Sequence, residues 1–323
     1  MNLIKPIPFF LIINLTGAAE ILGVSPFPIF SQFQLGDRLY KELVKRGHNV
    51  TVITPYKEKI PIDNFKQILI EDIFERVSGS NDAHYGFCHH FKAPCVALMP
   101  MPSTNWFSDM MGNSAPPSYV PQLLLSYTSG MNFFQRTQNA VAYYFSDAPH
   151  LDNLYYNLSL ILFNGHISVG DAVPLLPNTI DIAGYHINPP QKLPNDLQQY
   201  LDDGSEGNCY KQCVSKLKQR VIWKWEDDHL PDKPSNVLIR SWLPQQHILA
   251  HPNVVLFITH GGVSSTIEAV YHGKPILGLP VFSDQSLNMA KAEEAGYGRF
   301  IMFEDLCEER FREELHEVLR NPM

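Results

Sequence analysis

The first part of the chain alternates short apolar runs with one amphipathic stretch. Residues 21–24 form an apolar run that ends at a Ser-Pro-Phe-Pro loop, which is typical of a strand. Between residues 32 and 46, leucines recur at helical spacing, and Gly47 ends the predicted helix. A β-branched run follows at residues 50–53. This order of strand, helix and strand predicts a right-handed parallel unit that opens an α/β domain.

The second part of the chain repeats this pattern after a segment rich in breakers. Residues 188–207 are polar and contain several prolines, aspartates and glycines, which is typical of a linker between domains. An apolar strand is predicted before the linker, and further strands alternate with helical stretches after it. These strands are predicted at residues 158–163, 221–225, 237–239, 254–259 and 275–280. We therefore predict an N-terminal domain at residues 20–187 and a C-terminal α/β domain at residues 208–323.

Residues 1–19 have the pattern of a secretory signal peptide. Lys5 gives a positive start, residues 7–15 are apolar, and the small residues at positions 16–19 suit cleavage. A buried first strand would be an alternative interpretation of the same apolar run. No stretch of the chain is apolar for long enough to predict a transmembrane helix. We expect a chain without a membrane anchor, located in a lumen or outside the cell.

Composition and charge exclude some classes of function. The chain has 323 residues, of which 45% are hydrophobic and 18% charged, as in a globular protein with a proper core. The net charge of −8 argues against a nucleic-acid partner, which requires a basic face. Of the five cysteines, Cys209 and Cys213 are four residues apart and have no histidine or second cysteine pair nearby. No metal site is therefore predicted.

The middle of the chain, residues 87–145, is rich in aromatic residues, methionine and proline. Flexible thioethers and aromatic rings suit a pocket that accepts varied apolar ligands. Irregular packing of a core and its loops would give the same composition. Both interpretations are open at the level of the sequence.

A glycine-containing turn follows the predicted strand at residues 254–259. The turn begins at His260 and leads into a helix that Gly273 ends. Glycines at a strand-to-helix turn let the backbone approach a ligand closely. We expect Ser264 or Ser265 to cap the helix, whose N-terminus then forms an anion site. The first strand-to-helix turn lacks the G-x-G-x-x-G pattern of a dinucleotide site.

The segment from Trp242 to Gln285 carries the strongest motif. It reads WLPQQHILAHPNVVLFITHGGVSSTIEAVYHGKPILGLPVFSDQ, and it resembles the signature segment of UDP-glycosyltransferases along its whole length. Other segments are also similar to that family, namely QRVIWKWEDD, NVLIRSWLPQQ, NDAHYGFCHHFKAP, SLILFNGHISVG and GVSPFPIFSQFQLGDRLYKELVKRGHNVTVITPY. The sequence most resembles the insect branch of the family.

The resemblance implies a role for each matching residue. Trp242 would stack on uracil, and Gln245 would hydrogen-bond the uracil edge. Glu268 would accept both ribose hydroxyls. The diphosphate would lie at the helix N-terminus, held by His260, Gly262, Ser264 and Ser265, and hydroxyls of the transferred sugar would bind Asp284 and Gln285. Two of these residues have alternative interpretations, since Trp242 could be a core residue and Glu268 a solvated helix charge.

The resemblance also implies the fold and the reaction. Two Rossmann-like domains would face each other across a cleft, in the GT-B arrangement, with the donor in the C-terminal one. UDP-glucose or another UDP-hexose would be the co-substrate, and a small lipophilic molecule would be the acceptor. An acceptor hydroxyl would attack the anomeric carbon with inversion, without a cofactor or a metal, because the helix terminus stabilises the leaving diphosphate. Detoxification in the lumen of the endoplasmic reticulum is the implied setting.

The catalytic position departs from the family pattern. The family has a histidine base after the serine of the first loop, where this chain has Ser31 and then Gln32. An amide has no titratable lone pair near neutral pH and cannot accept the proton of an alcohol. The aspartate that orients the base in the family is matched weakly by Asp82. We expect amine acceptors to tolerate this change better than alcohols or phenols.

The chain is also shorter than the family pattern, at several internal positions and at its C-terminus. Predicted losses between Arg76 and Asn81 and near residues 146–150 leave the N-terminal domain incomplete. Another predicted loss, after Gly207, removes a strand from the centre of the donor sheet. An impaired transferase is the first hypothesis. A non-catalytic protein that binds UDP-sugar or pairs with full-length relatives is the alternative, and an unstable fragment is a third.

Overall fold

The computed structural model of the chain describes most of its residues. They are residues 18–25, 30–58, 60–70, 91–100, 113, 116–122, 125–144, 158–170, 175–202, 219–227, 230–231, 233–282 and 284–320, without the side chains of residues 30–32. The chain divides into two compact units, residues 1–84 and 85–323. Each unit is described by itself.

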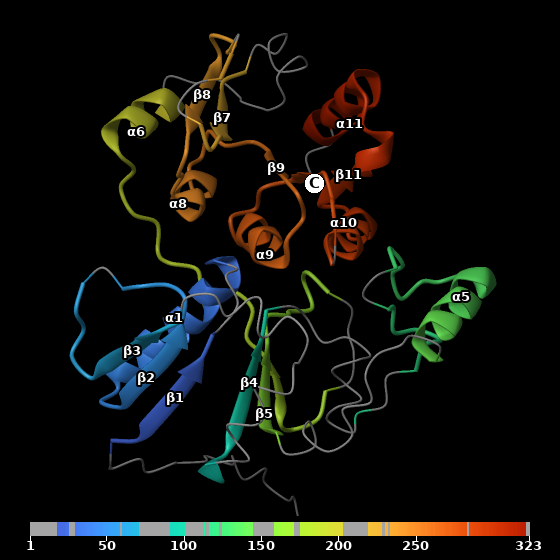
Figure 1. Cartoon of the computed structure of the whole chain (residues 1–323). Coiled ribbons are helices and arrows are strands. Elements are labelled where there is room, and N and C mark those ends of the chain that lie inside the picture. Colours follow the sequence, from blue (N-terminus) through green and yellow to red (C-terminus); the bar gives the residue numbers. More distant parts are fainter. Residues whose placement is uncertain are drawn as a thin grey trace, which may run out of the picture. The chain divides into compact units, whose positions relative to one another are not determined.

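The first unit is a small parallel sheet with one crossover helix (Figure 1). It consists of β1 (Glu20–Val24), α1 (Phe30–Lys45), β2 (Asn49–Thr54) and β3 (Phe65–Leu69), and the strands are parallel in the order β1-β2-β3. Val50 and Val52 in the central strand are fully buried, because β2 has a neighbour on each side. The predicted unit of strand, helix and strand is therefore confirmed.

The second unit begins with another parallel sheet. Its strands are β4 (Cys95–Met99), β5 (Leu158–Phe163) and β6 (Thr179–Asp181), in the order β4-β5-β6. Ile161 and Phe163 form the core of this sheet, as expected for an apolar central strand. The helix α5 (Phe133–Tyr144) lies between β4 and β5 in the sequence. Cys95 is disulfide-bonded, and Cys307 is a free, exposed thiol.

The rest of the second unit alternates strands and helices up to residue 320. The order is β7 (Val221–Lys224), β8 (Val237–Arg240), α8 (Gln245–Leu249), β9 (Phe257–Thr259), α9 (Val263–Tyr271), β10 (Ile276–Gly278), α10 (Gln285–Glu294), β11 (Gly298–Phe300), the 3-10 helix η2 (Phe303–Asp305) and α11 (Glu308–Arg320). All of these strands are parallel to their neighbours. They form two separate sheets, β7-β8 and β11-β10-β9.

Among the described residues, no strand joins these two sheets, and the loss of an inner strand stays a prediction. In a doubly wound fold of order 3-2-1-4-5-6, the first strand lies between the second and the fourth. The pair β7-β8 takes the places of strands two and three, and β9, β10 and β11 those of strands four to six. The described part of the chain supplies no strand between β7 and β9, and residues 203–218 lie outside it.

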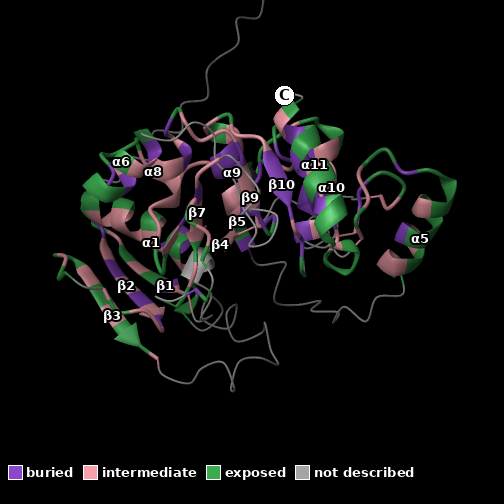
Figure 2. Ribbon diagram, turned by 90° about the horizontal axis from the view of Figure 1, so that it is seen from above, coloured by how far each residue is buried: buried purple, intermediate pink, exposed green. Residues whose placement is uncertain are grey.

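The strand β10 holds the core of the second unit, since helices cover both of its faces. Leu277 packs against the buried face of α11, which consists of Phe311, Leu315 and Val318 at helical spacing. On the other face, Ile276 packs with residues of α9 and α10. Figure 2 shows β10 as a buried strand between exposed helix faces. This double burial is typical of a parallel sheet.

Part of the predicted linker is packed structure. The helix α6 (Asn195–Asp202) lies within residues 188–207, and its buried leucines Leu197 and Leu201 contact Ile222 and Leu238 of the β7-β8 sheet. The predicted domain boundaries stay a prediction. Among the described residues, no helix has the length and apolar surface that crossing a bilayer requires.

The β10 core predicts a contrast between two phenylalanines. Phe311 is 1% exposed and Phe303 is 61% exposed. Phe311→Ala leaves a cavity between α11 and β10, so we expect the free energy of unfolding to fall by about 3–5 kcal/mol. Phe303→Ala should change it by less than about 0.5 kcal/mol. Urea denaturation measures both, and equal effects would contradict this description of the core.

Candidate functional site

The turn between β9 and α9 requires glycine at two successive positions. Gly261 has φ +86°, a conformation that other residues rarely adopt, and a Cβ there would lie 2.7 Å from Cγ of Met289. A Cβ on Gly262 would lie 2.7 Å from Nε2 of His260. The absence of side chains therefore lets the backbone of the turn pack closely against Met289 and the His260 ring.

The helix α9 begins without a side-chain cap. Gly262 is the N-cap residue, with φ −62° and ψ 140°, and the first helical hydrogen bond runs from Thr266 N–H to its carbonyl at 3.0 Å. The prediction that Ser264 or Ser265 caps the helix is wrong, because both serines lie inside the first turn. Within the described residues, no backbone acceptor takes the N–H groups of residues 263–265. These donors and the positive end of the helix dipole can bind an anion.

Trp242 lies in the turn between β8 and α8, and Gln245, the first residue of α8, contacts α9. Trp242 is 68% exposed, so the alternative of a core residue is wrong. Gln245 Nε2 donates to Ser265 Oγ at 3.1 Å and to Glu268 Oε2 at 2.7 Å. These bonds bring three of the predicted site residues into direct contact, while the exposed indole offers a flat apolar face.

Glu268 is a buried carboxylate rather than a solvated helix charge. It is 7% exposed, and its Oε1 accepts a hydrogen bond from Gln246 Nε2 at 3.0 Å. Burial raises the pKa of Glu268, but the neighbouring His186 and the hydrogen bonds from Gln245 and Gln246 outweigh burial and hold the pKa below its ordinary value. The carboxylate is therefore kept ionised inside the fold, ready to accept further hydrogen bonds.

The N-terminus of α10 is connected to the glycine turn by Asn288. The Nδ2 group of Asn288 donates to Asp284 Oδ2 at 2.7 Å and to the carbonyl of Gly261 at 2.9 Å. Asn288 was not predicted from the sequence, although its position four residues after Asp284 on one helix face indicates contact between them. This amide fixes the predicted sugar-binding carboxylate relative to the predicted diphosphate turn.

Gln285 contributes to the shape of the neighbouring loop. Its Oε1 accepts hydrogen bonds from the backbone N–H of Val281 at 2.8 Å and of Phe282 at 3.1 Å, and its side chain is buried. The hydrogen bonds of this oxygen are directed to the protein, so any contact of Gln285 with a ligand would use its Nε2 group. The role predicted for Gln285 stays a prediction.

His260 stands at the start of the turn and is exposed to solvent. Partial burial lowers the pKa of its imidazole, and the negative charge of Asp284 opposes that shift. The ring is therefore neutral at neutral pH, when one of its nitrogens can donate a hydrogen bond and the other can accept one.

The predicted catalytic pair cannot be compared with this geometry. The backbone of Gln32 lies in α1, but its side chain and the whole of Asp82 lie outside the described residues. The described part of the chain contains no cluster of metal-ligating side chains. The roles of Gln32 and Asp82 stay predictions.

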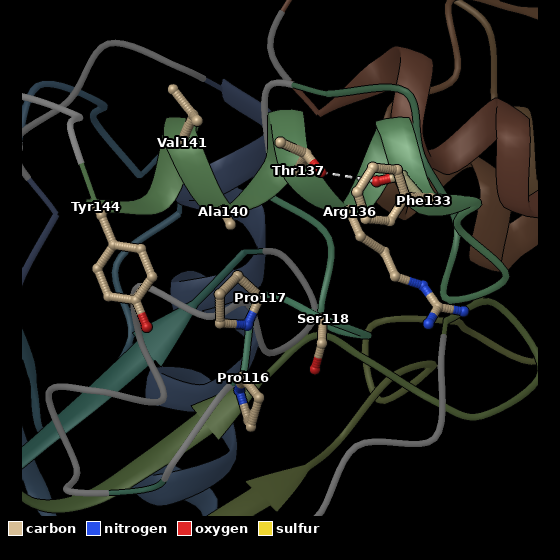
Figure 3. A pocket seen from close by; sticks show the side chains of 9 residues that line it. All are labelled: Pro116, Pro117, Ser118, Phe133, Arg136, Thr137, Ala140, Val141 and Tyr144. Atoms are coloured by element: carbon tan, nitrogen blue, oxygen red, sulfur yellow. Dashed lines mark hydrogen bonds between the residues drawn. The ribbon is translucent and has the colours of Figure 1, made fainter.

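A separate open pocket of about 670 Å³ lies along α5, within the methionine- and aromatic-rich region. Figure 3 shows side chains of α5 facing Pro116 and Pro117, with Arg136 near one end and Tyr144 near the other. The full lining consists of Pro116, Pro117, Ser118, Phe133, Arg136, Thr137, Ala140, Val141 and Tyr144. This surface is largely apolar and contains one cation, which suits a small lipophilic ligand.

Comparisons with known proteins decide the family. Residues 145–323 match the sequence model described as UDP-glucoronosyl and UDP-glucosyl transferase, which is more than half of the chain. UDP-glycosyltransferase UGT4 of Dactylopius coccus is 30% identical over 386 residues, covering 90% of this chain and 77% of that protein. The chain belongs to the UDP-glycosyltransferase family. The predicted family, its insect branch and the enzyme class are thereby confirmed.

The relatives also confirm that this UDP-glycosyltransferase is internally shortened. UDP-glycosyltransferase UGT5 of Dactylopius coccus is 28% identical over 411 residues, covering 96% of this chain and 78% of that protein. The whole chain has 323 residues, so at least 88 positions of that alignment (411 minus 323) have no counterpart in it.

Solved structures confirm the fold class. The chain is similar to the crystal structure of LpCGTa in complex with UDP, with a TM-score of 0.58 and 16% identity, over 95% of this chain and 91% of that one. Its structural neighbours are GT-B glycosyltransferases, and its own sheets are parallel within an α/β arrangement. The prediction of two Rossmann-like halves of GT-B type is therefore confirmed.

The buried carboxylate predicts a large effect on stability. Glu268→Ala leaves Gln245 and Gln246 without their shared acceptor and the buried His186 without its carboxylate neighbour, so the free energy of unfolding should fall by about 1–3 kcal/mol. Glu313→Ala, at an exposed position of α11, should change it by less than about 0.5 kcal/mol. Urea denaturation of both variants tests this, and a neutral Glu268→Ala would contradict the described network.

Proposed function

We propose that this UDP-glycosyltransferase binds a UDP-hexose at the turn between β9 and α9 and transfers the sugar to a small lipophilic acceptor. The observation that carries this proposal is the contact of Gln245 with Ser265 and Glu268, beside an uncapped helix N-terminus. Three groups that would contact base, diphosphate and ribose thus lie within one hydrogen-bonded cluster, inside the segment that matches the family.

The donor would lie across this cluster from base to sugar. Trp242 provides an exposed indole for stacking on uracil, and Gln245 provides an amide for the base edge. The N–H groups at the start of α9, with His260, would hold the diphosphate. Glu268 would accept hydrogen bonds from the ribose. Asp284, fixed by Asn288, would bind a hydroxyl of the transferred sugar.

The reaction follows from the position of the leaving group. A lone pair of the acceptor attacks the anomeric carbon from the face opposite to the diphosphate, the bond from that carbon to the diphosphate oxygen breaks, and the configuration inverts. The N-terminus of α9 stabilises the negative charge that develops on UDP. UDP leaves with the bonding electron pair, and the proton of the acceptor passes to a base or to water.

Loss of the base should limit this chain to some acceptors. Gln32 occupies the position of the family's histidine and cannot accept a proton, which typically costs about 100- to 10,000-fold in rate. An amine acceptor has a nucleophilic lone pair without prior deprotonation, so it should be less affected. The α5 pocket, with its largely apolar lining and Arg136, is a candidate surface for a lipophilic acceptor.

A second candidate function is a non-catalytic one. The gap of at least 88 alignment positions and the glutamine at position 32 both favour a protein that holds UDP-sugar without turnover, or that pairs with full-length relatives. Residues 1–19 would direct either form to the secretory pathway, with the lumen of the endoplasmic reticulum as the site of action.

Binding of UDP tests the donor site. Trp242→Ala removes the stacking surface for uracil, which is worth about 1–3 kcal/mol, so the Kd for UDP should rise about 5- to 150-fold. The control Phe303→Ala removes another exposed ring and should leave the Kd unchanged. Titration calorimetry on the full chain measures both. A folded wild-type chain without UDP binding would contradict the proposal.

Restoring the base separates the two candidate functions. Gln32→His should raise the rate of phenol glycosylation by about 100- to 10,000-fold if only the base is missing, with little change in the Kd for UDP. Transfer is measured with UDP-glucose and paired phenol and amine acceptors. No gain with the phenol, in a variant that still binds UDP, would favour the non-catalytic function.

A further inference from the structure

A buried histidine from outside the predicted donor domain approaches the carboxylate of Glu268. His186 lies between β6 and α6 and is 5% exposed. Its Nε2 lies 3.4 Å from Oε1 of Glu268, so the ring nitrogen faces this oxygen without forming a well-directed hydrogen bond. Among the described residues, neither nitrogen of this ring has a hydrogen-bond partner. A buried polar ring with so few bonds indicates a role tied to Glu268.

The second group on this side of the carboxylate is Gln246, whose amide can take only one orientation. Its Oε1 accepts from the backbone N–H of Asn188 at 2.9 Å and from the Nδ2 of the same residue at 3.3 Å. Its Nε2 donates to the carbonyl of His186 at 3.3 Å and to Oε1 of Glu268 at 3.0 Å. Reversing the amide would place donors against donors, so the network orients this N–H group toward Glu268.

The two oxygens of Glu268 therefore face different surroundings. Oε1 faces His186 and Gln246, which belong to the buried network. Oε2 faces Gln245, a half-buried residue on the side of the predicted base site. The segment that carries His186 is itself held against α9, because Ala183 and Ile187 pack on Val263 and Ile267.

We propose that His186 and Gln246 are positioning residues that hold Oε1 of Glu268 and direct Oε2 toward the ribose of the nucleotide. The inference rests on the proposed function, since it assigns a ribose to Glu268. A ribose hydroxyl replaces Gln245 as the donor to Oε2, and the released amide of Gln245 turns to the base. Recognition of base and ribose is thereby coupled through one exchange of hydrogen bonds.

The test compares UDP with 2′-deoxy-UDP, which lacks one ribose hydroxyl. The Kd of each ligand is measured by calorimetry on the full chain. The wild type should prefer UDP by about 10-fold or more, because a hydrogen bond to a buried ionised group is lost with the deoxy ligand. His186→Leu should reduce this preference to about 3-fold or less, while the Kd for 2′-deoxy-UDP stays within about 2-fold.

Two further variants separate positioning from packing. His186→Gln retains an N–H donor that can reach Oε1, so it should restore most of the preference for UDP. Ile187→Ala loosens the same segment without touching the carboxylate, so it should lower the melting temperature and keep the preference. Gln246→Leu removes the other donor to Oε1 and should lower the preference as His186→Leu does, which provides the same test if His186→Leu does not fold.

Each alternative outcome has a distinct meaning. If folded His186→Leu and Gln246→Leu keep the full preference for UDP, the inference is overturned and UDP binding stands. If His186→Leu weakens both ligands equally, as a packing defect would, the inference is also overturned. A wild-type chain that binds neither ligand overturns the proposed function itself. Equal binding of both ligands by the wild type overturns the role of Glu268 and the inference with it.

Discussion

A single buried charge organises the candidate site. Glu268 lies in the middle of α9, where the carboxylate is removed from water and must be compensated by donors. The donors come from α8 and from the segment before α6, so the ionised group connects parts of the chain that are about 20 and 80 residues away in sequence. Without these donors, burial would favour the protonated acid, and the site would lose its strongest acceptor.

The same network explains why the site persists in a shortened chain. The described strands of the donor domain form two sheets, β7-β8 and β11-β10-β9, yet the contacts between the site residues are side-chain hydrogen bonds rather than ladder bonds between the two sheets. Gln245 and Glu268 connect α8 to α9, and Asn288 connects α10 to the glycine turn. The core around β10 supports α10 and α11 on both faces. Side-chain hydrogen bonds and helix packing thus maintain the geometry of the turn.

Local patterns allowed much of the fold to be predicted. The strands at residues 50–53 and 158–163 were found because each is a β-branched or apolar run bounded by breakers, and the structure places each at the centre of its sheet. The helix α6 was missed because prolines and polar residues surround it, although Leu197 and Leu201 are spaced for one buried face. The N-cap of α9 was misplaced because the glycine turn continues to Gly262, which puts both serines inside the helix.

The sequence by itself determined the family, the glycine turn and the identity of the residues that would contact a donor. These features depend on residue type and spacing along one segment. The local steric preferences of those residues determine a strand, a turn and a helix. Only the tertiary structure decided which donors hold Glu268 and that Asn288 joins α10 to the turn. His186 lies 82 positions before Glu268, and no periodicity connects residues so far apart. A buried carboxylate needs polar neighbours close to it in space, and residues this far apart in sequence become neighbours only when the chain has folded.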